Sequence, residues 1–562
     1  MRSKRLTGRT VVYGLLLVIP VAFFALFFFY PLASILWLGL APDGVPDVVG
    51  WLQLTVSPYF RNVLWFTIWQ AALSTLLTLL LAFPGAYVLA RYRFRGKSLV
   101  RAIATVPFVL PTVVVATAFT ALIGPRGLIN SWLQDLLGLS SGPIQLSQTV
   151  WLILIAHVFY NYSIALRLIS TYWQNLSPAL PEAAQMLGAS RRQAFRHITL
   201  PALRPALLSS AALVFIYCFT SFGVILILGG PRFATIEVEI YRQALNLFNL
   251  PVAAGLSLWQ IIFTFILMWF YTRLQASSSR PTRIGRREAI ERPIQTLTDR
   301  ILVYGVVGAM MLFIGAPLVA LASRSLRGPD GLSLIYYREL FNRTGDSLFF
   351  VPPMEAVFNS LSFALVAMTL AVILGLLSAQ MLFNWERPSG RNGDVRTVAA
   401  RVLDPLLMLP LATSAVTLGL GYIIALDKPP LNLRSSIILV PIAHALVAIP
   451  FVLRSVLPAL RNIRPSWHEA ATTLGAGDWQ VWREITWPLL RSAILVGAVF
   501  AFTISMGEFG ATVFIARPQT PTMPVAIFRF LGQPGGAELW AGGCHEYPAY
   551  AGLRGRIYPA GY

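Results

Sequence analysis

The strongest constraint on this chain is a series of apolar runs, each long enough to cross a lipid bilayer. A transmembrane helix needs about 20 consecutive apolar residues, because the hydrocarbon core of a bilayer is about 30 Å thick. Eleven such runs carry few or no charges, at about residues 11–40, 63–90, 102–123, 149–166, 205–229, 250–272, 301–323, 357–385, 405–426, 435–453 and 492–515. Since backbone groups must be hydrogen-bonded within the hydrocarbon, the pattern predicts an all-α integral membrane protein.

The basic residues indicate how the chain is oriented. It carries 44 Lys and Arg against 23 Asp and Glu. If the N-terminus is cytoplasmic, 30 of the 44 basic residues fall in cytoplasmic segments, as the positive-inside rule requires. This distribution explains the basic character without a nucleic-acid partner. The first apolar run is too long for a cleaved signal peptide, and no small-residue cleavage site follows it.

Residues that could carry catalysis or bind metal are scattered. Cys218 and Cys544 are the only cysteines, and the five histidines show no spacing typical of metal ligands. The closest match to a phosphate-binding loop is Gly96-Lys97-Ser98, but Arg91 occupies the position of the first glycine of that loop. We therefore expect no catalytic residues, no metal site and no cofactor on this chain.

The chain is internally duplicated. A constant offset of 287 residues carries Glu182-Ala183-Ala184 onto Glu469-Ala470-Ala471, and Phe222-Gly223 onto Phe509-Gly510. Six apolar runs precede the second copy, so both copies start on the same side of the membrane. They are parallel repeats, related by an axis along the membrane normal. A substrate path between the two copies is the expected consequence.

The division into domains follows from this repeat. We assign residues 1–272 to a first half with six spans, 273–300 to a polar, basic cytoplasmic linker and 301–542 to a second half with five spans. The repeat predicts a twelfth span after Trp540, but residues 543–562 form an aberrant polar tail. We hypothesise that a reading-frame error has replaced the last helix.

In each copy the longest cytoplasmic loop carries the same four residues at the same spacing. These are Glu182, Gly188, Ile198 and Pro201 in loop 178–201, and Glu469, Gly475, Ile485 and Pro488 in loop 465–488. The spacing predicts two short helices joined by a turn at the glycine. The first short helix presents an apolar stripe that a groove on a partner protein would accept. An interfacial helix lying on lipid is the alternative, and the exact repetition of the pattern favours the docking helix.

The motif Glu-Ala-Ala, three residues, Gly, nine residues, Ile-x-x-Pro resembles the EAA loop of permease subunits in binding-protein-dependent ABC importers of the type I fold. Because both copies carry it, the chain resembles the fused, two-half permeases of the thiamine and ferric-iron group. Residues 156–161 (Ala-His-Val-Phe-Tyr-Asn) and 228–237, from Leu228 to Glu237, resemble the thiamine permeases more than the iron permeases. The resemblance implies two tandem six-helix permease repeats.

The resemblance also implies partners and roles. Two copies of a cytosolic ABC ATPase would bind ATP and Mg²⁺, and an extracytoplasmic solute-binding protein would deliver a small solute, thiamine or ferric iron. The chain itself would be no enzyme, and would lie in the bacterial inner membrane with its N-terminus in the cytoplasm. The residues implied in ATPase coupling are Glu182 and Glu469 as docking charges, Gly188 and Gly475 as turns, and Ala183, Ala184, Ala470 and Ala471 as the contact surface.

Four polar residues lie in or beside the spans. His157 and His444 occupy matching depths in the fourth span of each copy, and Glu508 matches Ser221. Polar side chains within a membrane either line a path or hydrogen-bond a neighbouring helix. All four are candidates for the translocation path, and the carboxylate of Glu508 could attract a cationic substrate. A helix–helix hydrogen bond explains the same residues.

Prolines interrupt the third apolar run of each copy. They are Pro107 and Pro111 in the first copy, and Pro405 and Pro410 in the second. A proline inside a helix removes a backbone hydrogen bond, so we expect the third span to be broken there. The break is either a hinge or a fixed kink.

Two other functional classes remain as alternatives to a transport permease. An integral-membrane enzyme needs His, Asp or Glu side chains clustered at one membrane face. An ion-coupled secondary transporter needs several carboxylates within the membrane. The sequence has scattered polar residues and, within the predicted spans, Glu508 nearly alone, so both classes fit it less well.

Overall fold

The computed structural model describes residues 18–278, 291–328, 331–341, 351–386, 393–427 and 431–532. These residues are almost entirely helical. The strands among them are short: β1 (Tyr92–Arg93) pairs in parallel with β2 (Arg292–Pro293), and β3 (Arg327–Gly328) pairs antiparallel with β4 (Gly331–Leu332). The predicted all-α membrane fold is confirmed.

The first half contains the helices α2 to α14. They are α2 (Tyr30–Leu40), α3 (Val48–Val56), α4 (Pro58–Arg91), α5 (Lys97–Val109), α6 (Thr112–Ile123), α7 (Leu128–Leu137), α8 (Val150–Asn175), α9 (Ala179–Met186), α10 (Arg191–Ala194), α11 (Leu200–Phe219), α12 (Gly223–Leu228), α13 (Ile236–Tyr241) and α14 (Leu250–Ser278). The π-helical segments η1 (Ala25–Phe29), η2 (Phe195–Thr199) and η3 (Arg242–Asn246) precede α2, α11 and α14.

The second half contains the helices α15 to α25. They are α15 (Leu297–Ser325), α16 (Ile335–Glu339), α17 (Pro353–Glu386), α18 (Gly393–Ala412), α19 (Ala415–Ala425), α20 (Leu439–Arg461), α21 (Pro465–Thr473), α22 (Asp478–Val481), α23 (Trp487–Gly507), α24 (Thr512–Ile515) and α25 (Met523–Leu531). The π-helical segment η6 (Trp482–Thr486) precedes α23. The predicted tail, residues 543–562, lies outside the described residues.

Ten helices in the described part of the chain are long and apolar enough to cross a membrane. An eleventh span is obtained when the bent pair formed by α18 and α19 is taken as one broken crossing. The structure thus agrees with the eleven predicted spans. In the first half, α5 ends at Val109 and the third span runs from Thr112 to Leu137, so the helix is broken between α5 and α6 and this span begins later than the predicted residues 102–123. The prolines lie in or just before these breaks, as their effect on helices predicts.

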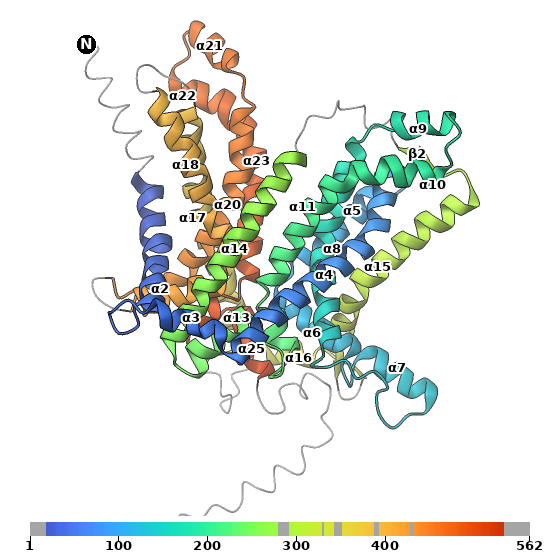
Figure 1. Ribbon diagram of the computed structural model, residues 1–562, viewed down its shortest axis with the longest axis horizontal. Helices are drawn as coiled ribbons and strands as arrows, with labels where there is room; N and C mark the ends of the chain where they lie inside the picture. The colour runs from blue at the N-terminus through green and yellow to red at the C-terminus, as the bar shows by residue number, and fades with distance from the viewer. Residues whose placement is uncertain are drawn as a thin grey trace, which may run out of the picture.

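Each half has a core of closely packed spans. In the first half α4 packs along α8, and in the second α17 packs along α20 and α23 (Figure 1). Glycines allow this approach: a Cβ atom on Gly85 would lie 2.6 Å from the Tyr162 hydroxyl, and one on Gly375 would lie 2.7 Å from Val452 Cγ1. Small residues at such contacts are typical of helix packing in membranes.

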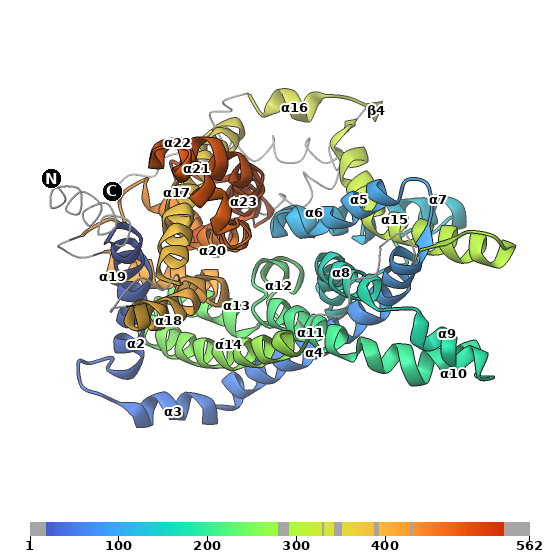
Figure 2. The ribbon, with the colours of Figure 1, turned by 90° about the horizontal axis from the view of Figure 1, so that it is seen from above.

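The first span of each half packs against the other half. Helix α2 contacts α19 of the second half as well as α14, and α15 contacts α4, α5 and α6 of the first half (Figure 2). The α2–α19 contact is tight, since a Cβ atom on Gly421 would lie 3.0 Å from Pro31 Cβ. The two sequence repeats are therefore interlocked in space.

The two short loop helices lie at one end of the molecule. Helices α9 and α21 project from the upper end in Figure 1, on opposite sides, whereas α13 and α25 lie at the lower end. The linker returns to the first half, where β2 pairs with β1 beside the end of α4. The long helices therefore separate two end regions of the molecule. One end region contains α9 and α21, and the other contains α13 and α25.

Candidate functional site

The first repeated loop folds into two short helices joined by a glycine turn. Glu182 lies in the first turn of α9, and Gly188 follows the helix with a φ of +94°. The turn is closed by backbone hydrogen bonds from Gly188 to Gln185 and from Ala189 to Ala184, each 3.0 Å long. Glycine adopts this left-handed conformation without steric penalty, which is why it ends helices so often.

The second repeated loop has the same geometry. Gly475 follows α21 with a φ of +88°, and the N–H of Ala476 donates to the carbonyl of Ala471 at 3.0 Å, the counterpart of the Ala189–Ala184 bond. The sequence spacing therefore reproduces one backbone shape twice. The ATPase-coupling role of the residues in these loops stays a prediction.

Both loop helices present apolar side chains to the surroundings. No residue of α9 is buried, and the side chains of Leu187 and Leu474, at equivalent positions, are 90% and 88% exposed. Ala183 and Ala470 are also exposed, while Ala184 is half-buried. Leu180 and Met186 of α9 are exposed as well, at 69% and 90%, so the first loop carries several exposed apolar side chains.

The charges of the two loops differ. Glu182 Oε1 accepts a hydrogen bond from Arg292 Nη2 of the linker at 3.3 Å. The linker is held there by the β1–β2 pairing and by an ion pair of 2.8 Å between Lys97 Nζ and Glu291 Oε1. Among the described residues, Glu469 has no ion pair. The sequence alone predicts two equivalent docking charges. The spacing of the repeated residues does not reveal that the linker folds back onto only one of the two loops.

The two path histidines are buried and hydrogen-bonded. His157 Nδ1 lies 3.0 Å from Ser74 Oγ, and His157 Nε2 lies 2.8 Å from Ser221 Oγ. The imidazole thus joins α8 to α4 and to the segment that precedes α12. His157 and Ser221, two of the residues predicted for the path, are brought together by a hydrogen bond.

In the second copy the histidine is also buried and hydrogen-bonded, but its partners come from α23, from α24 and from the carboxylate of Glu508. His444 Nδ1 lies 2.7 Å from Ser505 Oγ, and His444 Nε2 lies 2.7 Å from Thr512 Oγ1 and 3.3 Å from Glu508 Oε2. Glu508 also accepts the N–H groups of Ala511 at 2.8 Å and Thr512 at 3.0 Å, and the Thr512 hydroxyl. Glu508 therefore caps the N-terminus of α24. These contacts favour a scaffold role, and the path role of the four residues stays a prediction.

The two halves meet through a repeated Phe-Gly pair. The rings of Phe222 and Phe509 are stacked, with centroids 5.6 Å apart and planes 21° apart. A Cβ atom on Gly223 would lie 2.4 Å from Thr112 Oγ1, and one on Gly510 would lie 2.9 Å from Ala415 Cβ. Each glycine thus lets its segment approach the broken third span of one half. The internal repeat of the sequence identifies this Phe-Gly pair but does not indicate its role.

A buried carboxylate that the sequence analysis gave no role also links the halves. Glu237 on α13 is fully buried; its Oε2 accepts from Ser414 Oγ at 2.5 Å, and its Oε1 accepts from Gln260 Nε2 at 2.8 Å. Ser414 in turn caps α19 through the N–H groups of Val416 and Thr417. Burial raises the pKa of Glu237 to about 8, and the hydrogen bonds from Ser414 and Gln260 oppose that rise.

Glu237 lies outside every predicted span, so it was not among the polar residues predicted to lie within the membrane. The sequence signal for this residue is Ile236-Glu237-Val238, in which a charged residue lies between two apolar residues near a predicted span. Among the described residues, no group of three or more His, Cys, Asp or Glu could hold a metal ion.

Comparison with known proteins adds independent information. Residues 82–280 and 371–530 match the family described as "Binding-protein-dependent transport system inner membrane component". The two matched segments contain the two repeated loops, one in each. Together they cover more than half of the chain.

Curated relatives match most of the chain. It is 27% identical to the thiamine transport system permease protein of Haemophilus influenzae over 92% of this chain and 90% of the relative. It is 28% identical to the thiamine transport system permease protein of Escherichia coli over 86% of this chain and 85% of the relative. A probable ABC transporter permease protein of Sinorhizobium fredii is 25% identical over 84% of this chain and 83% of the relative.

Proposed function

We propose that this chain, which belongs to the family of binding-protein-dependent transport system inner membrane components, imports thiamine. It is a multi-pass membrane protein and the fused, two-half permease subunit of an ABC importer. Proteins of this family work with an ATPase and with a solute-binding protein. The proposal adds the substrate, the number of ATPase subunits, the inner membrane and a cytoplasmic N-terminus.

The single observation that carries the choice of substrate is the extent of the similarity to thiamine permeases. The match to the Haemophilus influenzae protein spans 92% of this chain and 90% of that protein, so it includes both halves and both loops. This similarity favours thiamine over ferric iron.

In this proposal two ATPase subunits dock on the repeated loops, one on α9 and one on α21. The exposed Leu187 and Leu474 would enter a groove of each ATPase, and Ala183 and Ala470 would allow its surface to approach closely. Glu182 and Glu469 would bind basic residues of the ATPase. Closure of the ATPase pair on ATP would then move α9 and α21, and with them the two halves.

The contact between the halves supports a gate at the opposite end. Helix α11 has 20 residues and rises about 30 Å from the end at α9 to the end near Phe222. The Phe222–Phe509 stack and the Glu237–Ser414 hydrogen bond close the contact there. We propose that this is the resting state, closed toward the binding protein, and that the movement of α9 and α21 separates the two rings.

The substrate is tested by transport in a complete assembly. The permease, its ATPase and its binding protein are reconstituted in liposomes, and uptake is measured with thiamine, ferric iron and small anions. We expect ATP-dependent uptake of thiamine and stimulation of ATP hydrolysis by the thiamine-loaded binding protein. Stimulation by ferric iron alone would contradict the proposed substrate. Uptake driven by an ion gradient without any ATPase would favour a secondary transporter instead.

A further inference from the structure

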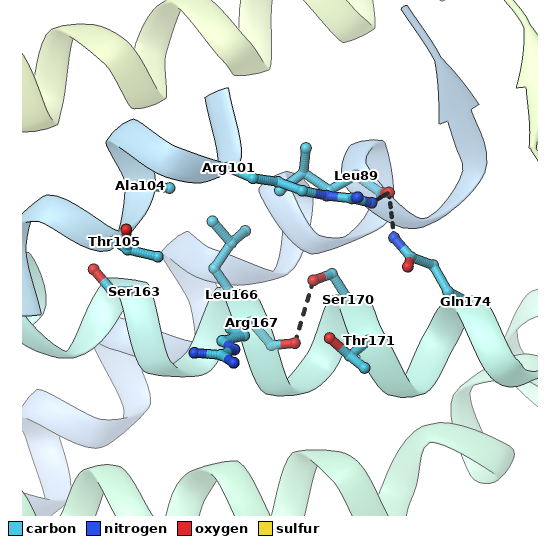
Figure 3. Close-up of a pocket in the computed structure, with 10 residues that line it drawn as sticks. All are labelled: Leu89, Arg101, Ala104, Thr105, Ser163, Leu166, Arg167, Ser170, Thr171 and Gln174. Atoms are coloured by element: carbon cyan, nitrogen blue, oxygen red, sulfur yellow. Dashed lines mark hydrogen bonds between the residues drawn. The ribbon is translucent and has the colours of Figure 1, made fainter. Parts of the chain in front are cut away.

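A pocket lies between α5 and α8 of the first half, near the end of the molecule that carries α9. Its volume is about 190 Å³, and Figure 3 shows the side chains around it. The lining residues of α8 fall between Ser163 and Gln174, in the last turns before the chain enters α9. None of the predicted or described functional residues lines this pocket.

The charge of the pocket is positive. Arg101 from α5 and Arg167 from α8 both line it, and none of its ten lining residues is acidic. The carbonyl oxygen of Leu89 accepts from Arg101 Nη2 at 3.3 Å and from Gln174 Nε2 at 2.7 Å, so the end of α4 helps to hold these two side chains. Arg167 is exposed and has no ion pair among the described residues. In Figure 3 the two arginines point in different directions, and Arg101 is directed toward Leu89 and Gln174, so the guanidinium group available to an anion is that of Arg167.

A buried hydroxyl in the same pocket lacks a partner. Ser163 is only 5% exposed, and its Oγ makes no hydrogen bond in the described part of the chain. Nearly all buried polar groups in folded proteins are hydrogen-bonded, so this hydroxyl is available to donate to a group that enters the pocket. The neighbouring hydroxyls differ, because Thr105 donates to the carbonyl of Ala102 and Ser170 donates to that of Arg167.

The second half differs at the described positions that match two of the pocket residues. The repeat offset of 287 places Pro450 at the position of Ser163, which removes the hydroxyl. It places Arg454 at the position of Arg167, and Arg454 interacts with the hydroxyl of Tyr271. At these two described positions the second half therefore differs from the pocket of the first half.

We propose that this pocket binds a phosphate group. A guanidinium group matches a phosphate with two parallel N–H···O bonds, and the Ser163 hydroxyl would donate a further bond to a phosphate oxygen. The phosphate belongs either to an anionic phospholipid headgroup or to a small soluble molecule. Both sources present the same chemistry to the pocket, and the ligand would lie directly before α9. Binding of a phosphate group in this pocket does not depend on which solute the permease transports.

The test uses the full-length permease with two kinds of probe. In the first arm, the protein in nanodiscs of phosphatidylcholine alone is titrated with inorganic phosphate and with pyrophosphate by calorimetry. In the second arm, native mass spectrometry counts the phosphatidylglycerol molecules retained against a phosphatidylcholine background. The variants are Arg167→Gln and Ser163→Ala. The matched control is Arg192→Gln, because Arg192 is an exposed arginine of α10 outside the pocket.

We expect Arg167→Gln to weaken binding about tenfold, since charge-assisted hydrogen bonds are the strong ones. Ser163→Ala should weaken binding about threefold and leave the unliganded protein at least as stable, because it removes an unpaired buried hydroxyl. Arg192→Gln should have no effect. Binding of phosphate or pyrophosphate assigns a soluble ligand, and retention of phosphatidylglycerol alone assigns a lipid.

Three results would overturn the proposal. The first is an absence of binding in both arms. The second is equal loss in the Arg167 and Arg192 variants, which would indicate attraction by overall charge. The third is unchanged binding in Ser163→Ala, even where Arg167→Gln is too unstable to measure, because Ser163→Ala is expected to fold.

Discussion

Replacing Glu508 by Gln tests whether this buried carboxylate supports the fold or serves the path. The carboxylate accepts hydrogen bonds from the backbone N–H groups of Ala511 at 2.8 Å and Thr512 at 3.0 Å, and from the Thr512 hydroxyl. It also lies 3.3 Å from His444 Nε2. Bonds to a charged acceptor contribute about 1.5–3 kcal/mol each, and the amide of Gln would turn an N–H group toward existing donors. Breaking such a buried network costs about 3–5 kcal/mol. We expect Glu508→Gln to lower the free energy of unfolding by that amount.

Ser221→Ala provides the matched comparison, because Ser221 is the repeat equivalent of Glu508. It removes one neutral hydrogen bond of 2.8 Å to His157 Nε2, which contributes about 1–2 kcal/mol including the unpaired nitrogen. Unfolding of both variants is measured by denaturant titration in mixed micelles. We expect the loss in the Glu508 variant to exceed the loss in the Ser221 variant.

A particular outcome would refute this reasoning about Glu508. If Glu508→Gln unfolds at the same denaturant concentration as the unmodified protein but abolishes uptake, the carboxylate acts on the substrate and does not cap α24. A loss of stability with uptake preserved in the folded fraction supports the scaffold role.

Three further changes test the coupling loop, the contact between the halves and the linker. Gly188→Ala places a Cβ atom at a φ of +94°, which costs about 1–2 kcal/mol locally, so ATPase affinity measured by pull-down should fall about tenfold. Because the pKa of Glu237 is raised from 4.5 to about 8, its contribution to the free energy of unfolding is full below pH 4.5 and is lost as pH rises through 8. In Glu237→Gln the free energy of unfolding should therefore no longer fall with pH over this range. Arg292→Ala breaks an exposed ion pair with Glu182 and should change the free energy of unfolding by less than about 1 kcal/mol, while ATPase binding is retained.

Features set by local sequence were predictable. The spans follow from the length of apolar runs, and the glycine turns follow from the left-handed conformation that Gly188 and Gly475 adopt. The broken third spans follow from prolines such as Pro107 and Pro410, which lie within a few residues of the breaks. In each case the physical cause lies in the same continuous stretch of sequence as its effect.

Features set by long-range packing were not predictable. Periodicity identifies α2 and α15 as spans, but it does not reveal that each packs against the opposite half. The Glu237–Ser414 hydrogen bond joins residues 177 positions apart, and the Arg292–Glu182 pair depends on the linker folding back onto β1. A repeat offset relates equivalent positions and carries no information about contacts that break the symmetry, such as this pair.

The most direct test of the account is the affinity of the ATPase for the permease when both loop glutamates are reversed. The permease in nanodiscs is titrated with its ATPase, and the double variant Glu182→Arg, Glu469→Arg is compared with the control Asp135→Arg. Asp135 is exposed on α7, at the end opposite α9 and α21. We predict that the double variant loses at least about 100-fold in affinity and that the control keeps it. Equal ATPase affinity in all three proteins would contradict docking on α9 and α21.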